Sequence, residues 1–240
     1  MRTPLVALAV AALVGAAALS GCEGPGATTA LGYTEDAKRA YDAAMQDYDA
    51  HDWLSAQALL REVKRKYSYS KYARLAELRI ADADFEQEKF ADAIREYKEF
   101  IHSHRSDADD VSYARSRIAE STYAEIPESA LIGTPEERDQ ASVVDAYKEL
   151  THYLADYPEA KESPHVRALL EQVIARLVRH ELYIARFYLG KDDYGAAVAR
   201  VKYALENYAE ALARGSTDGS VERSDLIAEA LLLLGKTYLK

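Results

Sequence analysis

The 240-residue sequence contains a single cysteine, six prolines and eleven glycines. One cysteine cannot form an intramolecular disulfide, which excludes a small disulfide-stabilised domain. The scarcity of proline and glycine, together with 49% hydrophobic residues, excludes a disordered chain and favours helices. Basic residues are also in deficit, because 40 acids against 30 bases give a formal net charge of −10. A chain this acidic argues against nucleic-acid binding, which requires cations to neutralise phosphates.

The sequence also lacks the motifs of common catalytic sites. His180-Glu181 begins an H-E-x-x-H pattern, but Ile184 stands where the second zinc ligand belongs. His102 and His104 are two residues apart, which places them on different faces of a helix. We find no G-x-S-x-G, glycine-rich phosphate loop or paired-cysteine metal site. We therefore predict a protein that is not an enzyme and uses no cofactor or metal.

Only the N-terminus carries a long hydrophobic run, from Leu5 to Ala18, after Met1-Arg2. This run is short for a membrane-spanning helix and fits the apolar region of a signal peptide. It ends in Leu19-Ser-Gly-Cys22, which resembles the bacterial lipobox. We predict that residues 1–21 are a lipoprotein signal peptide and that Cys22 is lipidated. The alternative is a plain secretory signal with an incidental cysteine.

A helical repeat is the dominant pattern of the remaining chain. Between residues 85 and 101, apolar side chains recur at spacings of three, four and seven, separated by charged residues. The members of this stripe are Phe90, Ala93, Ile94, Tyr97, Phe100 and Ile101. Three further copies of the pattern carry a small alanine at the matching position, namely Ala56, Ala146 and Ala197. A larger side chain there would push two packed helices apart, so the pattern predicts stacked helix pairs.

We expect an all-α fold, a tetratricopeptide-repeat (TPR-like) α-solenoid of stacked helix-turn-helix units. Residues 22–34 are predicted to be a flexible tether, because they contain Gly, Pro and Thr without periodicity. The solenoid should span residues 35–240, with repeats at about 35–69, 70–109, 110–162, 163–214 and a partial fifth at 221–240. The third repeat carries a loop insertion at residues 126–140, which is either a contact site or a tolerated insertion.

Eighteen tyrosines are more than a helical core needs, because a buried tyrosine must find a partner for its hydroxyl. Several aromatic residues fall where this repeat class lines its concave groove or joins its first two pairs: Tyr41, Tyr48, Tyr67, Tyr72 and Phe85. A groove of this kind suits an extended or terminal peptide that carries an aromatic residue. The alternative for each residue is ordinary packing between repeats.

Nearly all of the mature chain resembles the BamD family, the tetratricopeptide lipoproteins of the outer-membrane β-barrel assembly machine. The segments that carry the resemblance are Tyr41-x-x-Ala44-x-x-x-Tyr48 before Asp52-Trp53, Arg138-Asp-Gln140, His180-Glu-Leu-Tyr-Ile-Ala-Arg-Phe-Tyr188, Tyr194 and Ala197-Val-Ala-Arg-Val201. The resemblance implies a protein anchored by lipid to the outer membrane on its periplasmic face. It also implies three kinds of protein partner: a POTRA domain of the barrel subunit, other assembly lipoproteins and unfolded outer-membrane proteins.

By the same resemblance, Arg200 and Tyr194 belong to the partner-binding surface, while Tyr67 and Tyr72 match the substrate-facing end of the first repeat. The chain departs from the family in two ways, because only Tyr157-Pro158 keeps the Tyr-Pro repeat end and the fifth repeat lacks a second helix. The expected function is a non-catalytic scaffold for β-barrel assembly. The alternative is a general periplasmic TPR adaptor lipoprotein that organises cell-wall or secretion factors.

Overall fold

The computed structural model describes residues 30–127, 134–209 and 221–239, and all regular secondary structure within these ranges is helical. The helices are α1 (Ala30–Asp49), α2 (Trp53–Lys66), α3 (Lys71–Glu86), α4 (Phe90–Ser103), α5 (Ala108–Ala124), α6 (Ala141–Asp156), α7 (Ser163–Leu189), α8 (Tyr194–Ala204) and α10 (Val221–Tyr238). A π-helical turn, η1 (Leu205–Ala209), extends α8. The expected all-α fold is confirmed.

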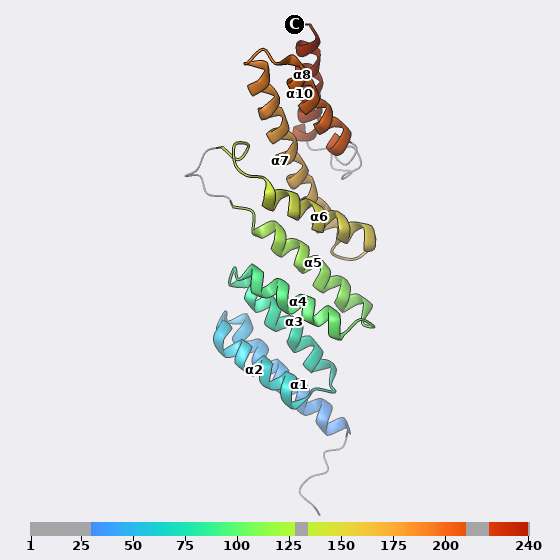
Figure 1. Ribbon diagram of the computed structural model, residues 1–240. Coiled ribbons are helices and arrows are strands. Elements are labelled where there is room, and N and C mark those ends of the chain that lie inside the picture. Colours follow the sequence, from blue (N-terminus) through green and yellow to red (C-terminus); the bar gives the residue numbers. More distant parts are fainter. Residues whose placement is uncertain (1–29, 128–133, 210–220, 240) are drawn as a thin grey trace, which may run out of the picture.

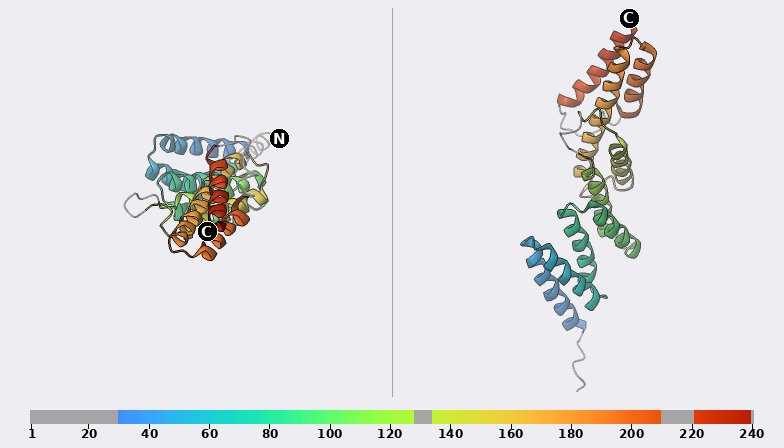
Figure 2. Two further views of the ribbon diagram at one scale, coloured as in Figure 1. Left: turned by 90° about the horizontal axis from the view of Figure 1, so that it is seen from above. Right: turned by 60° about the vertical axis from the view of Figure 1, so that its left-hand side comes forward.

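Consecutive helices pack as antiparallel hairpins, and each hairpin packs on the next to form a rod with the C-terminus at one tip (Figure 1). The views in Figure 2 show the same rod from its end and from its side. Its buried apolar residues divide into three clusters, centred on α1 to α3, on α3 to α5, and on α6 to α10. This division is what a repeat array produces, because each unit buries its apolar face against its neighbours.

Three of the turns between paired helices share one backbone conformation. His51, Glu88 and Asp192 have φ angles of 60°, 59° and 58°, and each lies two residues before the next helix begins. A left-handed conformation is costly for residues other than glycine, so its recurrence at equivalent positions indicates a repeated unit. The side chains of Asp52 and Asp193 then cap α2 and α8, each accepting a backbone N–H of its helix at 3.3 and 3.0 Å.

The four small alanines of the repeat pattern are completely buried. Ala56, Ala93, Ala146 and Ala197 all have no exposed surface, and each lies in the second helix of its pair. The packing reason inferred from the sequence is therefore confirmed, because a methyl group lets the two helices of a pair approach closely.

The first helix begins earlier than the sequence predicts. We expect the tether to extend to residue 34 and the solenoid to begin at residue 35, but α1 starts at Ala30. The ring of Tyr33 packs edge-on against the ring of Tyr67, with centroids 5.4 Å apart. This contact extends the apolar face of α1 toward its N-terminus, so residues 30–34 belong to the first repeat. The rest of the predicted tether lies outside the described residues.

The insertion in the third repeat is fixed at both of its ends. Ile126, its first residue, is buried, and the side chain of its last residue, Gln140, donates hydrogen bonds to the carbonyls of Pro135 and Arg138 at 2.9 and 2.8 Å. Arg138 also donates to the Pro127 carbonyl at 3.2 Å, which ties the two ends together. Residues 128–133 lie outside the described part. The insertion borders a cavity of about 450 Å³ against α7.

The longest helix, α7, connects two parts of the rod. It has 27 residues, and Pro164 lies in its first turn, where the missing N–H costs no helix hydrogen bond. The helix contacts α5 and α6 on one side and α8 and α10 on the other (Figure 1). It therefore lies within the stack as a shared element of the third pair, the fourth pair and α10.

Candidate functional sites

A buried carboxylate organises the polar residues of the second and third repeats. Asp82 of α3 is 2% exposed, and its Oδ1 accepts hydrogen bonds from the hydroxyls of Tyr97 and Tyr113 at 2.5 and 2.9 Å. Its Oδ2 pairs with Arg79, one turn earlier on the same helix. A buried charge is tolerated only when it is paired and hydrogen-bonded, and Asp82 meets both conditions.

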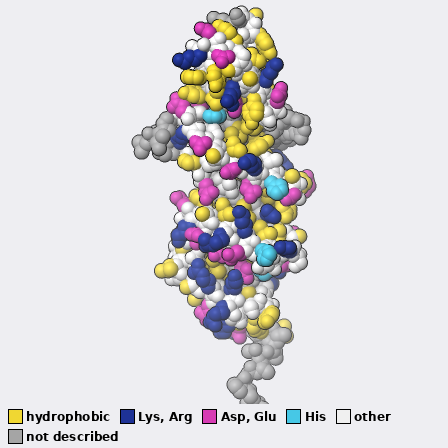
Figure 3. Space-filling view, in the orientation of Figure 1, with side chains coloured by type: hydrophobic (Ala, Val, Ile, Leu, Met, Phe, Trp, Pro, Cys, Tyr) yellow, Lys and Arg dark blue, Asp and Glu magenta, His cyan; other side chains and the backbone are white. Residues whose placement is uncertain are grey.

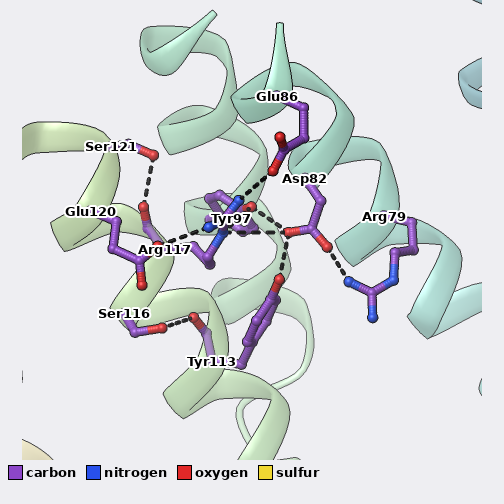
Figure 4. Close-up of polar contacts among 9 residues, drawn as sticks. All are labelled: Arg79, Asp82, Glu86, Tyr97, Tyr113, Ser116, Arg117, Glu120 and Ser121. Carbon is purple, nitrogen blue, oxygen red and sulfur yellow. Dashed lines mark hydrogen bonds and ion pairs between the residues drawn. The ribbon is translucent and has the colours of Figure 1, made fainter. Parts of the chain in front are cut away.

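Arg117 of α5 joins this group from the neighbouring helix (Figure 4). It donates to the Tyr97 hydroxyl at 3.3 Å and forms ion pairs with Glu120 at 2.8 Å and Glu86 at 3.5 Å. Its guanidinium also lies 3.7 Å from the centre of the Phe85 ring, a cation–π contact. We call Arg79, Asp82, Tyr97, Tyr113 and Arg117 the Asp82 cluster, which links α3, α4 and α5.

The cluster holds its tyrosines in the neutral form. Burial raises the pKa of Tyr97 and of Tyr113, and the adjacent Asp82 carboxylate raises both further. Burial likewise raises the pKa of Tyr48 to about 12, with Asp82 and Glu86 adding to the shift. Hydroxyls that stay protonated can donate to Asp82, so the cluster keeps its hydrogen bonds throughout the neutral pH range.

Four of the five predicted groove residues lie near or on the Asp82 cluster. Tyr41 is half-buried beside Arg79 and packs against Tyr72, with ring centroids 5.7 Å apart. Tyr48 packs edge-on against Trp53 at 5.1 Å. Phe85 lies beneath Arg117 and contacts the Phe90 ring at 5.4 Å. Tyr41 therefore lies beside the Arg79 side of the Asp82 cluster and Phe85 beside its Arg117 side, while Tyr48 lies near enough for the charges of Asp82 and Glu86 to raise its pKa.

Tyr67 has a different environment from the other four residues. It is only 8% exposed and packs in the core formed by α1, α2 and α3, against Tyr33. The Tyr67 side chain is therefore better explained by ordinary packing between helices, which was the alternative interpretation of the sequence, than by a position in a groove. The reason is the early start of α1, which places Tyr33 over the Tyr67 ring.

The two residues predicted to bind a partner lie on the fourth pair. Arg200 of α8 donates to the Glu181 carboxylate of α7 at 3.3 Å, and Glu181 is 8% exposed. Tyr194 donates to Asp192 at 2.8 Å in the turn before α8. Both residues therefore have an internal partner, and about two-fifths of the Arg200 side chain remains open to solvent.

Most of the exposed large apolar residues in the described part of the chain lie at this end of the rod. Figure 3 shows yellow side chains over α7, α8 and α10, whereas charged side chains dominate the opposite half. The exposed large apolar residues of α7, α8 and the α10 region are Tyr183, Phe187, Tyr203, Leu231, Leu232, Tyr238 and Leu239. We call this set the C-terminal apolar surface. Surfaces of this kind mark sites of interaction with other proteins.

The described residues contain no group of His, Cys, Asp and Glu that could hold a metal ion. His180, the first residue of the incomplete zinc pattern, contacts the Glu136 carbonyl through Nδ1 at 2.7 Å, and Glu181 pairs with Arg200. No helix in the described ranges is long and apolar enough to cross a membrane. Cys22 and the predicted signal peptide lie outside the described residues.

Sequence reasoning did not single out the two arginines that hold the cluster together. Arg79, Asp82 and Glu86 recur at spacings of three and four on α3, so they share one helix face. That spacing was the available signal for Arg79. Arg117 reaches Asp82 from a helix 35 residues further along the chain, and no local pattern indicates such a contact.

Comparisons with known proteins agree with this architecture. The family model YfiO, described as an outer membrane lipoprotein, matches residues 34–217. The outer membrane protein assembly factor BamD of Caulobacter vibrioides is 26% identical over 230 residues, which cover 95% of this chain and 71% of that protein. The BamD protein of Neisseria gonorrhoeae is 21% identical over 206 residues, which cover 85% of this chain and 72% of that protein. The family match spans most of the solenoid, and the chain therefore belongs to the YfiO family of outer membrane lipoproteins, the family of the BamD assembly factors.

Proposed function

We propose that this chain is a non-catalytic, lipid-anchored scaffold for the assembly of outer-membrane β-barrel proteins. Its C-terminal repeats would hold a POTRA domain of the barrel subunit, and its N-terminal repeats would receive unfolded outer-membrane proteins. Cys22 would carry the lipid. The assembly role is supported by the family membership and by the relatives, which are outer membrane protein assembly factors.

The C-terminal apolar surface is the observation that carries the proposal for a partner at this end. Phe187 and Tyr203 are 56% and 46% exposed, and both lie on the pair that carries Arg200. Aromatic residues and arginine are the side chains that contribute most often to binding hot spots. A folded domain that covered this surface would remove it from water.

Capture of the purified barrel subunit tests this assignment. Phe187→Ser should weaken capture by about 5-fold to 30-fold, the usual effect of truncating a central aromatic residue. Leu54→Ser is the matched control, because Leu54 is 81% exposed but lies on α2 at the other half of the rod. Equal capture by both variants would remove the C-terminal apolar surface from the interface.

The role of Arg200 requires a separate comparison. Arg200→Glu would place a second carboxylate beside Glu181 and disturb the fold, so Arg200→Gln is the better probe. If Arg200 contacts the partner directly, Arg200→Gln weakens capture while Glu181→Gln, which frees the guanidinium, preserves it. Equal losses in the two variants would mean that the ion pair serves only the packing of α7 on α8.

The proposed binding of unfolded outer-membrane proteins by the N-terminal repeats can be tested on the same protein. Tyr41→Ala should lower the binding of an unfolded outer-membrane protein without lowering capture of the barrel subunit, since Tyr41 lies on α1. Simultaneous loss of both activities would argue for a folding defect and against two separate sites. Unchanged binding of the unfolded protein would remove Tyr41 from the receiving site.

A further inference from the structure

A cleft lies between α4 and α5, which pack side by side near the middle of the rod (Figure 1). The cleft has a volume of about 460 Å³. Its described lining residues, which we call the α4–α5 cleft, are Lys98, Ile101, His102, Arg105, Val111 and Arg115. None of these six residues is acidic, and none belongs to the Asp82 cluster or to the C-terminal apolar surface.

The cations of the cleft have no acidic partner within the described part of the chain. Lys98, Arg105 and Arg115 form no ion pair there. The Arg105 guanidinium donates to Nδ1 of His102 at 3.0 Å, a contact that uses one of its five N–H groups. Arg115 is half-buried on the same side of α5 as Val111, which is 9% exposed. A cation partly removed from water without a counter-ion is costly, and a bound carboxylate would offset this cost.

Most acidic residues of α4, α5 and the turn between them are paired with other cations. These ion pairs join Asp92 and Glu96 to Arg95, Asp107 and Asp110 to Arg74, and Glu120 to Arg117. Glu99 and Asp109 are exposed, but neither lines the cleft. Asp109 lies two residues before Val111, which places it on nearly the opposite face of α5. The charged side chains that line the cleft are therefore all positive.

The acidity of the whole chain acts at longer range than these side chains. A net charge of −10 repels an acidic ligand at a distance, but salt screens exposed charges beyond about 8 Å at physiological ionic strength. A carboxylate inside the cleft would approach a guanidinium to about 2.8 Å, where a charge-assisted hydrogen bond forms. The lining residues therefore decide which charge the cleft accepts.

The surroundings of the cleft suit a peptide chain. A second hollow of about 610 Å³ adjoins the cleft, shares Lys98 and His102 with it, and continues along α4 past Ile94 to Ala91. Glu99 lines this second hollow, so this part favours apolar groups over acidic ones. Together the two hollows follow α4, whose 14 residues span about 20 Å. About six residues of an extended peptide have the same length.

We infer that the α4–α5 cleft binds an extended acidic segment of a partner protein, with Asp or Glu side chains on its cations and apolar neighbours on Ile101 and Val111. Arginine binds a carboxylate through two parallel N–H groups, so Arg105 and Arg115 hold the acidic side chains. The inference goes beyond the proposed function, because it adds a third binding surface to the two assigned there.

Fluorescence anisotropy of a labelled peptide on the purified protein tests the inference. The probe is an acetylated and amidated hexapeptide of four glutamates and two leucines. Two control peptides carry glutamine or lysine in place of every glutamate. We expect the glutamate peptide to bind, and both control peptides to bind at least about 10-fold more weakly, because they cannot form ion pairs with the cleft.

A charge reversal in the cleft is the decisive variant. Lys98→Glu combined with Arg105→Glu changes two exposed side chains, so the melting temperature should stay the same. Each reversed contact is worth about 3-fold to 5-fold, so the glutamate peptide should bind about 10-fold to 25-fold more weakly. The lysine peptide should then bind more tightly than the glutamate peptide. Arg65→Glu combined with Lys66→Glu makes the same charge change on exposed residues of α2 and should leave binding unchanged.

Four outcomes would overturn the inference. They are no binding of the glutamate peptide to the unmodified protein, equal binding of the glutamate and glutamine peptides, equal weakening in the two double variants, and a lysine peptide that gains nothing from the charge reversal. A fifth is tight binding of a glutamine peptide with a free carboxyl end. That result would show that the cleft takes a chain terminus and not an internal acidic segment.

Discussion

The two halves of the rod differ in how many ion pairs their side chains form and in how many large apolar residues they expose. From α1 to α5 the described side chains form many ion pairs, including the buried Asp82 cluster, and few large apolar residues are exposed. From α7 to α10 the described ion pairs are few, and the C-terminal apolar surface replaces them. The same repeat architecture therefore supports one half that is rich in internal ion pairs and another half whose exposed apolar residues suit a protein partner.

The largest expected effect comes from the centre of the polar half. Asp82→Ala should lower the free energy of unfolding by about 3–5 kcal/mol, because it leaves Arg79 and two tyrosine hydroxyls without their buried acceptor. Urea denaturation measures the change. Asp42→Ala removes an exposed ion pair with Lys38 and serves as control, with an expected loss of about 0.2–1 kcal/mol. Similar losses in the two variants would show that Asp82 does not organise this half.

Overpacking a helix pair should have a smaller effect. Ala93→Trp fills a completely buried position between α4 and its neighbours and should cost about 1–3 kcal/mol. Ala228→Trp, on the exposed face of α10, should leave the melting temperature nearly unchanged. An unchanged melting temperature for Ala93→Trp would contradict the repeat phasing.

The smallest effect is a loss of stability in alkali. A tyrosine with a raised pKa holds its proton more tightly in the folded chain, so its contribution is complete below about pH 10 and falls as the pH rises toward 12. Tyr97 and Tyr113 shift in the same direction. We expect Tyr97→Phe to reduce the slope of unfolding free energy against pH between 10 and 12. An unchanged slope would contradict the raised pKa of the buried Tyr97 hydroxyl.

Local sequence signals were sufficient for the helices and their repeat phase. The apolar spacing and buried alanines such as Ala93 follow from helix geometry, which depends on neighbouring residues. The start of α1 was placed too late because the deciding contact, Tyr33 on Tyr67, joins residues 34 positions apart.

The candidate sites were less accessible to sequence reasoning than the fold. Tyr41, Tyr48 and Phe85 could be placed on one surface from their spacing, but the ion pair of Arg117 with Asp82 depends on how α5 packs on α3. The ion pair between Arg200 and Glu181 likewise arises from the packing of α8 on α7. Contacts between helices determine which charged residue is free, and a single sequence does not encode them locally.

The continuity of α7 has a mechanical consequence for the proposed scaffold. A 27-residue helix is about 40 Å long, and it has no break at which the third and fourth pairs could pivot. Proteins bound at opposite ends of α7 would accordingly be kept at a constant separation.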